Sequence, residues 1–218
     1  MSSGASPALG GRVPPAERRR RVAAPVQPFE VVAIASSAGG VTALAEVLRG
    51  LPAGFNAILV CVQHLDPRHR SLMPQVIGRR SSLPVLEAAD GMHVAAGHVY
   101  LAPPDHHMLI NGDATVSLTH TELVNFVRPS ADLLFESVAA AFGHRVIAVV
   151  LTGAGKDGSM GVTAVKKRGG TVIVQDEATS EFFGMPSAAI RTGAADFVLS
   201  LEEIPGALVT LVEGGMLD

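Results

Sequence analysis

A single cysteine occurs in the sequence, and several kinds of segment are missing altogether. Cys61 has no partner for an intramolecular disulfide, and because it lies in an apolar run we expect a buried thiol rather than a nucleophile. Neither a signal-peptide core nor an apolar stretch of about 18 residues is present. The 17 basic and 20 acidic residues give a formal net charge of −3, so the chain has no overall attraction for nucleic acid or anionic membranes. We therefore expect a cytoplasmic protein that neither inserts into a membrane nor binds nucleic acid.

The first 28 residues differ in composition from the rest of the chain. They are rich in Ser, Gly, Pro and Arg, so we expect residues 1–28 to form a disordered tail. The basic run Arg18–Arg21 in this tail is either simply solvated or a docking arm for an acidic partner. The tail is too short to be a folded regulatory domain. The chain is 48% hydrophobic, enough for a large core, and we expect one folded domain over residues 29–218.

From Phe29 onward, apolar runs of strand length alternate with segments of helical period. This alternation is typical of an α/β domain with a mostly parallel, doubly wound sheet. One hairpin interrupts it, because His107–Ile110 and Thr115–Leu118 flank Asn111-Gly112, and both turn residues tolerate positive φ. The predicted strands of the main sheet are Val31–Ser36, Ala57–Val62, a short one near Val85, His98–Leu101, Val146–Leu151, Thr171–Gln175 and Ala195–Leu199.

Three strand ends carry the groups that a serine hydrolase uses. Ser37 follows the first strand, His64 the second, and Asp157 lies in the glycine-rich loop after Val146–Leu151. Because the carboxyl ends of parallel strands meet at one edge of the sheet, these side chains can converge. Triads are defined by geometry and not by chain order, so we predict Ser37 as nucleophile, His64 as general base and acid, and Asp157 as the group that orients His64.

Small residues surround the predicted nucleophile. Ala38 and Gly39 precede a helix N-terminus, whose unpaired N–H groups can stabilise the oxyanion formed by serine attack. The same geometry binds phosphate, so this loop alone does not distinguish the two chemistries. Glycine packing without chemistry is also compatible with the loop. For Asp157 the alternative is a structural role, capping a helix that begins near Gly158.

The histidines do not suggest a metal centre. His106 and His107 are adjacent on a predicted strand and therefore face opposite sides of the sheet. His64 and His69 have no obvious third ligand except Asp66. We therefore predict no metal site.

Several separated motifs, in one order, resemble the catalytic domain of the CheB family of chemotaxis protein-glutamate methylesterases. The resemblance covers about Phe29 to Val212. The motifs are Ile34-Ala-Ser-Ser-Ala-Gly-Gly40, Gln63-His64, His98-Val-Tyr-Leu-Ala-Pro-Pro104, Arg128-Pro-Ser130, Leu151-Thr-Gly153 with Asp157-Gly158, and Phe183-Gly-Met-Pro186.

This resemblance implies hydrolysis of γ-glutamyl methyl esters on the cytoplasmic helices of chemoreceptors, with methanol as a product. Some members of the family also deamidate receptor glutamines, and the resemblance implies that this chemistry could use the same site. It further implies a catalytic triad formed by Ser37, His64 and Asp157, and it implies no cofactor. Ala38 stands where the family commonly has Thr, and Ala154 where it commonly has Met, so only backbone donors remain at these two positions. The family usually carries a receiver domain before the esterase, and we expect no control by receiver phosphorylation within this chain.

Two alternatives remain from the sequence. One is a non-catalytic scaffold of the same fold that docks a signalling partner in trans. The other is an esterase acting on a non-receptor ester, since fold and triad do not define the substrate.

Overall fold

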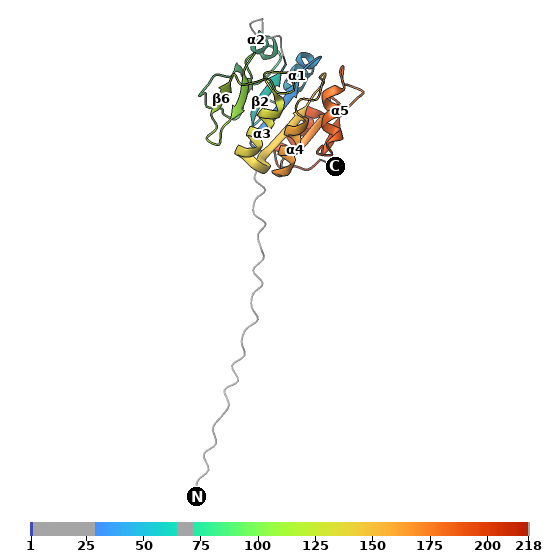
Figure 1. The fold of residues 1–218 in the computed structure, drawn as a ribbon. Helices are drawn as coiled ribbons and strands as arrows, with labels where there is room; N and C mark the ends of the chain where they lie inside the picture. The colour runs from blue at the N-terminus through green and yellow to red at the C-terminus, as the bar shows by residue number, and fades with distance from the viewer. Residues whose placement is uncertain (2–28, 65–71, 218) are drawn as a thin grey trace.

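The computed structural model describes Met1, residues 29–64 and residues 72–217. Residues 2–28 of the predicted tail over residues 1–28, which include Arg18–Arg21, lie outside the described residues, as do Asp66 and His69. Within them the chain forms a seven-stranded sheet and a separate two-stranded sheet (Figure 1). The order in the large sheet is β3-β4-β2-β1-β7-β8-β9, and every pair is parallel. Its strands are β1 (Val31–Ser36), β2 (Ile58–Gln63), β3 (Val85–Glu87), β4 (Val99–Leu101), β7 (Val146–Val150), β8 (Thr171–Gln175) and β9 (Phe197–Leu199).

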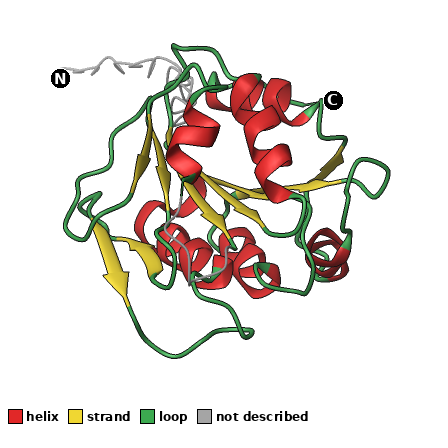
Figure 2. Ribbon diagram, turned by 90° about the horizontal axis from the view of Figure 1, so that it is seen from above, coloured by secondary structure: helices red, strands yellow, loops and turns green. Residues whose placement is uncertain are grey.

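The central strands are apolar up to their last residues, Ser36 in β1 and Gln63 in β2, because helices cover both faces of the sheet (Figure 2). All residues of β1, β2 and β7 are buried. Cys61 in β2 is among them, and this burial raises the pKa of its thiol. The expectation of a buried thiol is therefore confirmed.

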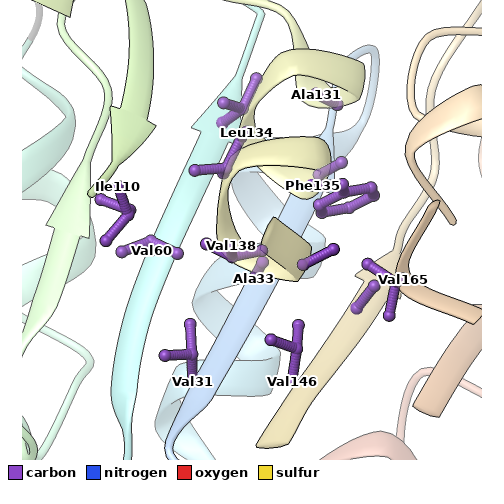
Figure 3. Packing of buried hydrophobic residues seen from close by; sticks show 14 of the residues in the cluster. Val31, Ala33, Val60, Ile110, Ala131, Leu134, Phe135, Val138, Val146 and Val165 are labelled. Carbon is purple, nitrogen blue, oxygen red and sulfur yellow. The ribbon is translucent and has the colours of Figure 1, made fainter. Parts of the chain in front are cut away.

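Each face of the sheet has its own hydrophobic cluster. Alternate residues of β1, such as Val31 and Ala33, pack on the side of α3, where Leu134, Phe135 and Val138 form the centre of the cluster (Figure 3). The helices on this face are α3 (Ala131–Phe142), α4 (Ser159–Lys167) and α5 (Gly184–Arg191). The opposite face carries α1 (Gly40–Arg49), α2 (Met73–Gly78) and α6 (Ile204–Val212). No helix in the described part of the chain combines the length and apolar character needed to cross a membrane.

The winding of the sheet reverses at β1. From β1 the chain moves outward through α1 to β2, and it later returns on the other side of β1 as β7. The loops that follow β1, β2 and β7 therefore emerge at one edge of the sheet, around the point where the strand order reverses. The predicted doubly wound α/β fold is confirmed.

The predicted hairpin is present as β5 (His107–Ile110) and β6 (Val116–Thr119), paired antiparallel. Its turn differs from the prediction. Asn111 and Gly112 do not adopt positive φ, and the left-handed residue is instead Ala114, at +61°. The Asn111 side chain bonds Thr115 and Ser117, which holds a longer turn than the two-residue one that Asn-Gly indicates.

Candidate active site

Ser37 lies in the sharp connection between β1 and α1. Its backbone N–H donates to the carbonyl of Thr152 at 3.0 Å, which ties the loop to the end of β7. Gly39 has a φ of +75°, a conformation that L side chains rarely adopt. A Cβ on Gly40 would lie 2.3 Å from Oε1 of Gln63, so only glycine fits there. The two glycines thus let the chain turn abruptly just after Ser37.

Gln63 joins the serine loop to the histidine. Its Oε1 accepts from the Ser36 hydroxyl at 2.7 Å, and its Nε2 donates to the carbonyls of Ser37 and His64 at 2.8 and 2.9 Å. The N–H of His64 donates to the carbonyl of Ser36 at 3.1 Å. Ser37 and His64 are therefore held side by side, each just beyond the end of its strand. These hydrogen bonds fix the backbone of both residues.

The imidazole of His64 faces Asp157. Nε2 lies 3.0 Å from Oδ2 of Asp157. A carboxylate only accepts, so this contact places the imidazole proton on Nε2 and leaves Nδ1 with a free lone pair. Within the described residues neither Nδ1 nor the Ser37 hydroxyl has a hydrogen-bond partner, so both remain available for proton transfer. The predicted triad residues are thus gathered at one edge of the sheet.

Asp157 is buried and accepts hydrogen bonds at both oxygens. Oδ2 also accepts from the N–H of Ala131 at 2.6 Å, while Oδ1 accepts from the Ser130 hydroxyl at 2.9 Å and the N–H of Asp132 at 3.3 Å. Burial raises the pKa of Asp157, but the hydrogen bonds from His64 and Ala131 and the electrostatic interaction with His64 outweigh it. The pKa of Asp157 is therefore held below its usual range, and the group is ionised.

The helix that Asp157 caps is not the one expected from the sequence. The structural alternative placed it at the start of a helix near Gly158, yet α4 begins there without any side-chain cap. Asp157 instead contacts the first turn of α3, whose own N-cap is Ser130. The positive end of that helix contributes to keeping the carboxylate ionised.

Asn125 is a neighbour of the site that the sequence analysis missed. Its Nδ2 donates to Oδ2 of Asp132 at 2.8 Å and to Oδ1 of Asp157 at 3.2 Å. The amide thereby bridges two buried carboxylates that repel one another. Burial raises the pKa of Asp132, and the charge of Asp157 adds to this rise. No local sequence signal marks Asn125, because its partners lie 7 and 32 residues away.

The residues expected to supply oxyanion donors lie around Ser37. In the described part of the chain, the backbone N–H groups of Ala38, Gly39 and Ala154 have no hydrogen-bond acceptor. Gly153, which precedes Ala154, packs so tightly on Ser37 that a Cβ on Gly153 would lie 2.9 Å from Ser37 Cβ. Unpaired backbone donors close to a serine are groups that can stabilise a tetrahedral oxyanion.

The adjacent histidines His106 and His107 contact different parts of the chain. Nδ1 of His107 accepts from the N–H of Ser130 at 3.1 Å, and its Nε2 lies 3.0 Å from the carbonyl of Glu122. Nδ1 of His106 lies 3.0 Å from the carbonyl of Pro104. Among the described residues, no group of three or more His, Cys, Asp or Glu side chains is arranged to hold a metal ion.

A parallel, doubly wound sheet with helices on both faces places the chain in the class of Rossmann-like α/β domains. The family model for the CheB methylesterase matches residues 32–208. The crystal structure of the Thermotoga maritima CheB methylesterase catalytic domain superposes with a TM-score of 0.80 at 40% identity, covering 83% of this chain and 97% of that one. The chain belongs to the CheB methylesterase family.

Sequence relatives agree with this assignment and differ in length. A protein-glutamate methylesterase/protein-glutamine glutaminase of Pyrococcus abyssi is 39% identical over 90% of this chain and 54% of the relative. The protein-glutamate methylesterase FrzG of Myxococcus xanthus is 39% identical over 91% of this chain and 60% of the relative. A relative from Leptospira interrogans is 37% identical, and the match covers 86% of this chain and 97% of the relative. The chain thus spans just over half of some relatives and nearly all of another.

Proposed function

We propose that the chain is a protein-glutamate methylesterase that uses Ser37, His64 and Asp157 as a catalytic triad. The observation that carries this proposal is the contact between His64 Nε2 and the buried, ionised Asp157, with Ser37 alongside and its hydroxyl unengaged. A binding module has no need of an oriented imidazole next to an unpaired serine. The names of the relatives support the same reaction.

In the first half-reaction the Ser37 Oγ attacks the carbonyl carbon of a γ-glutamyl methyl ester. Nδ1 of His64 accepts the hydroxyl proton, and Asp157 stabilises the imidazolium that results. The oxyanion is met by the N–H groups of Ala38, Gly39 and Ala154. The carbon–methoxy bond then breaks, the imidazolium gives its proton to the leaving oxygen, and methanol departs from a glutamyl ester of Ser37.

The second half-reaction uses water in place of the serine. His64 accepts a proton from water as it attacks the acyl-enzyme, and the proton returns to Ser37 as the acyl bond breaks. The product is a glutamate side chain. A glutamine substrate passes through the same acyl-enzyme with ammonia as the leaving group, so the site also suits deamidation of receptor glutamines.

The substrate of the proposed reaction is the methylated cytoplasmic helix of a chemoreceptor. The test is to incubate the purified chain with receptor fragment carrying radiolabelled methyl esters and to measure released methanol. We expect methanol release that depends on the chain. A chain that hydrolyses small esters but leaves the receptor methylated would be an esterase for another substrate. A chain that hydrolyses neither would be a non-catalytic member of the fold.

The pH dependence of hydrolysis should report one proton. Because the pKa of Asp157 lies below its usual range, Asp157 stays ionised on the acidic limb and does not add to its slope. Protonated imidazole cannot accept the serine proton, so kcat/KM should fall tenfold per pH unit on that limb. The measurement is kcat/KM against pH on the receptor fragment. An acidic limb with a slope of two would show that Asp157 titrates as well.

We further propose that residues 29–218 form the complete catalytic unit. The contacts that build the site come from segments between Ser36 and Gly184. A chain lacking residues 1–28 should therefore release methanol within about twofold of the full-chain rate at saturating substrate. Side-by-side kinetics of the two chains check this. A large rise or fall on truncation would assign the tail a part in controlling the site.

A further inference from the structure

The turn that carries Asn125 has an unusual sequence for its shape. Val124 and Val127 each donate their N–H to the other's carbonyl, at 3.2 and 3.0 Å, so Asn125 and Phe126 form a two-residue turn. Their φ angles are +52° and +66°. Asn-Gly is the preferred pair in a turn with two left-handed residues, because glycine alone adopts the second position without strain. Here a bulky aromatic residue occupies it.

Phe126 is also almost fully exposed. Its relative exposure is 94%, whereas most large apolar side chains of the described chain are buried. An exposed aromatic side chain contributes nothing to the core, and the positive φ makes its backbone unfavourable as well. Both features act against stability. A strained, exposed residue of this kind is better explained by recognition than by folding.

The turn is attached directly to the proposed triad. Asn125, the residue before Phe126, donates to Oδ1 of Asp157, whose Oδ2 contacts His64. Phe126 therefore stands at the Asp157 end of the site. A second exposed aromatic, Phe182, stands at the Ser37 end, because its carbonyl accepts from the N–H of Gly153, which packs on Ser37.

A helical substrate explains this placement. A methyl ester on a helix reaches Ser37 only if the helix lies across the active site. Residues one helical turn from the ester, on the same face of the helix, then contact the residues that border the site. We propose that Phe126 is a specificity-determining residue that contacts the apolar surface of the receptor helix beside the methylated glutamate. The inference rests on the proposed function and names the residue that binds its substrate.

The test uses Phe126→Gly, which suits the turn and therefore separates recognition from folding. We expect its thermal midpoint to equal or exceed that of the unaltered chain. Two substrates are compared, namely the methylated receptor fragment, followed by methanol release, and p-nitrophenyl acetate, which is too small to reach the residues that border the site. The ratio of kcat/KM for receptor to that for the small ester should fall about tenfold, as truncation of an interface aromatic commonly causes.

Two further variants serve as controls. Phe126→Tyr keeps the aromatic surface and should restore the ratio to within about twofold. Met216→Ala removes an equally exposed side chain, 89% accessible, from the segment after α6, and should leave both rates unchanged. If Phe126→Gly keeps the ratio of the unaltered chain, or if Met216→Ala lowers it as much, the inference is overturned.

Binding of the methylated fragment is measured in parallel, in a Ser37→Ala background that prevents turnover. Adding Phe126→Gly should weaken this binding about tenfold. If the chain that retains Ser37 releases no methanol, although binding in the Ser37→Ala background depends on Phe126, the proposed reaction is overturned and the Phe126 contact is supported. Equal binding with and without the aromatic ring would overturn the inference, whether or not methanol is released.

Discussion

Ser37→Ala and His64→Ala should each lower methanol release from the methylated receptor by about four orders of magnitude or more. The first removes the atom that attacks the ester, and the second removes the acceptor of its proton. The two groups act as one unit, so the double variant should be little slower than either single variant. Neither side chain belongs to the hydrophobic clusters, and thermal midpoints should therefore stay close to that of the unaltered chain. Single-turnover assays on the receptor fragment provide the measurement.

Ser36→Ala is the matched control for this assignment. Ser36 is fully buried, and its hydroxyl donates to Oε1 of Gln63 instead of facing the substrate. Gln63 keeps its bonds to the Ser37 and His64 carbonyls when that hydroxyl is lost, so we expect a decrease of about tenfold or less. An inactive Ser36 variant together with an active Ser37 variant would move the nucleophile to Ser36.

The strands and the winding of the sheet could be predicted because burial on both faces leaves a direct mark on the sequence. The predicted Val31–Ser36 is found unchanged as β1, and the predicted Ala57–Val62 is found one residue later as β2. Runs of this kind are read from consecutive residues alone. The convergence of Ser37, His64 and Asp157 followed from a general property of parallel sheets, so it needed no knowledge of side-chain contacts.

Features that depend on tertiary contacts were missed. The helix α5 is short and begins near a glycine and a proline, Gly184 and Pro186, which weaken its local signal, so it was not predicted. Its Met185 and Ala189 join the core only because the sheet provides a surface to pack against. The bond from Asn125 to Asp157 and the contacts of Asp157 with the first turn of α3 join residues 25 to 32 positions apart. Such pairings are properties of the fold and not of any local pattern.

The largest combined loss should follow substitution of Asp157, which serves both the reaction and the fold. Asp157→Ala removes the acceptor that holds the proton on His64 Nε2, and loss of the orienting carboxylate typically costs about four orders of magnitude in rate. It also leaves the N–H groups of Ala131 and Asp132 and the Ser130 hydroxyl without their buried partner. Leaving these donors unpaired should reduce the free energy of unfolding by about 3 kcal/mol.

Urea denaturation and methanol release, measured on the same preparations, separate the two roles of Asp157. Ser37→Ala is the control, since it should abolish the reaction while retaining stability, whereas Asp157→Ala should lose both. Asp157→Asn should not rescue either property, because its amide NH₂ would face donors from the α3 N-terminus or from His64, at positions where only an acceptor fits. A variant at this position that is inactive yet as stable as the unaltered chain would refute the capping role, and one that keeps full activity would refute the orienting role.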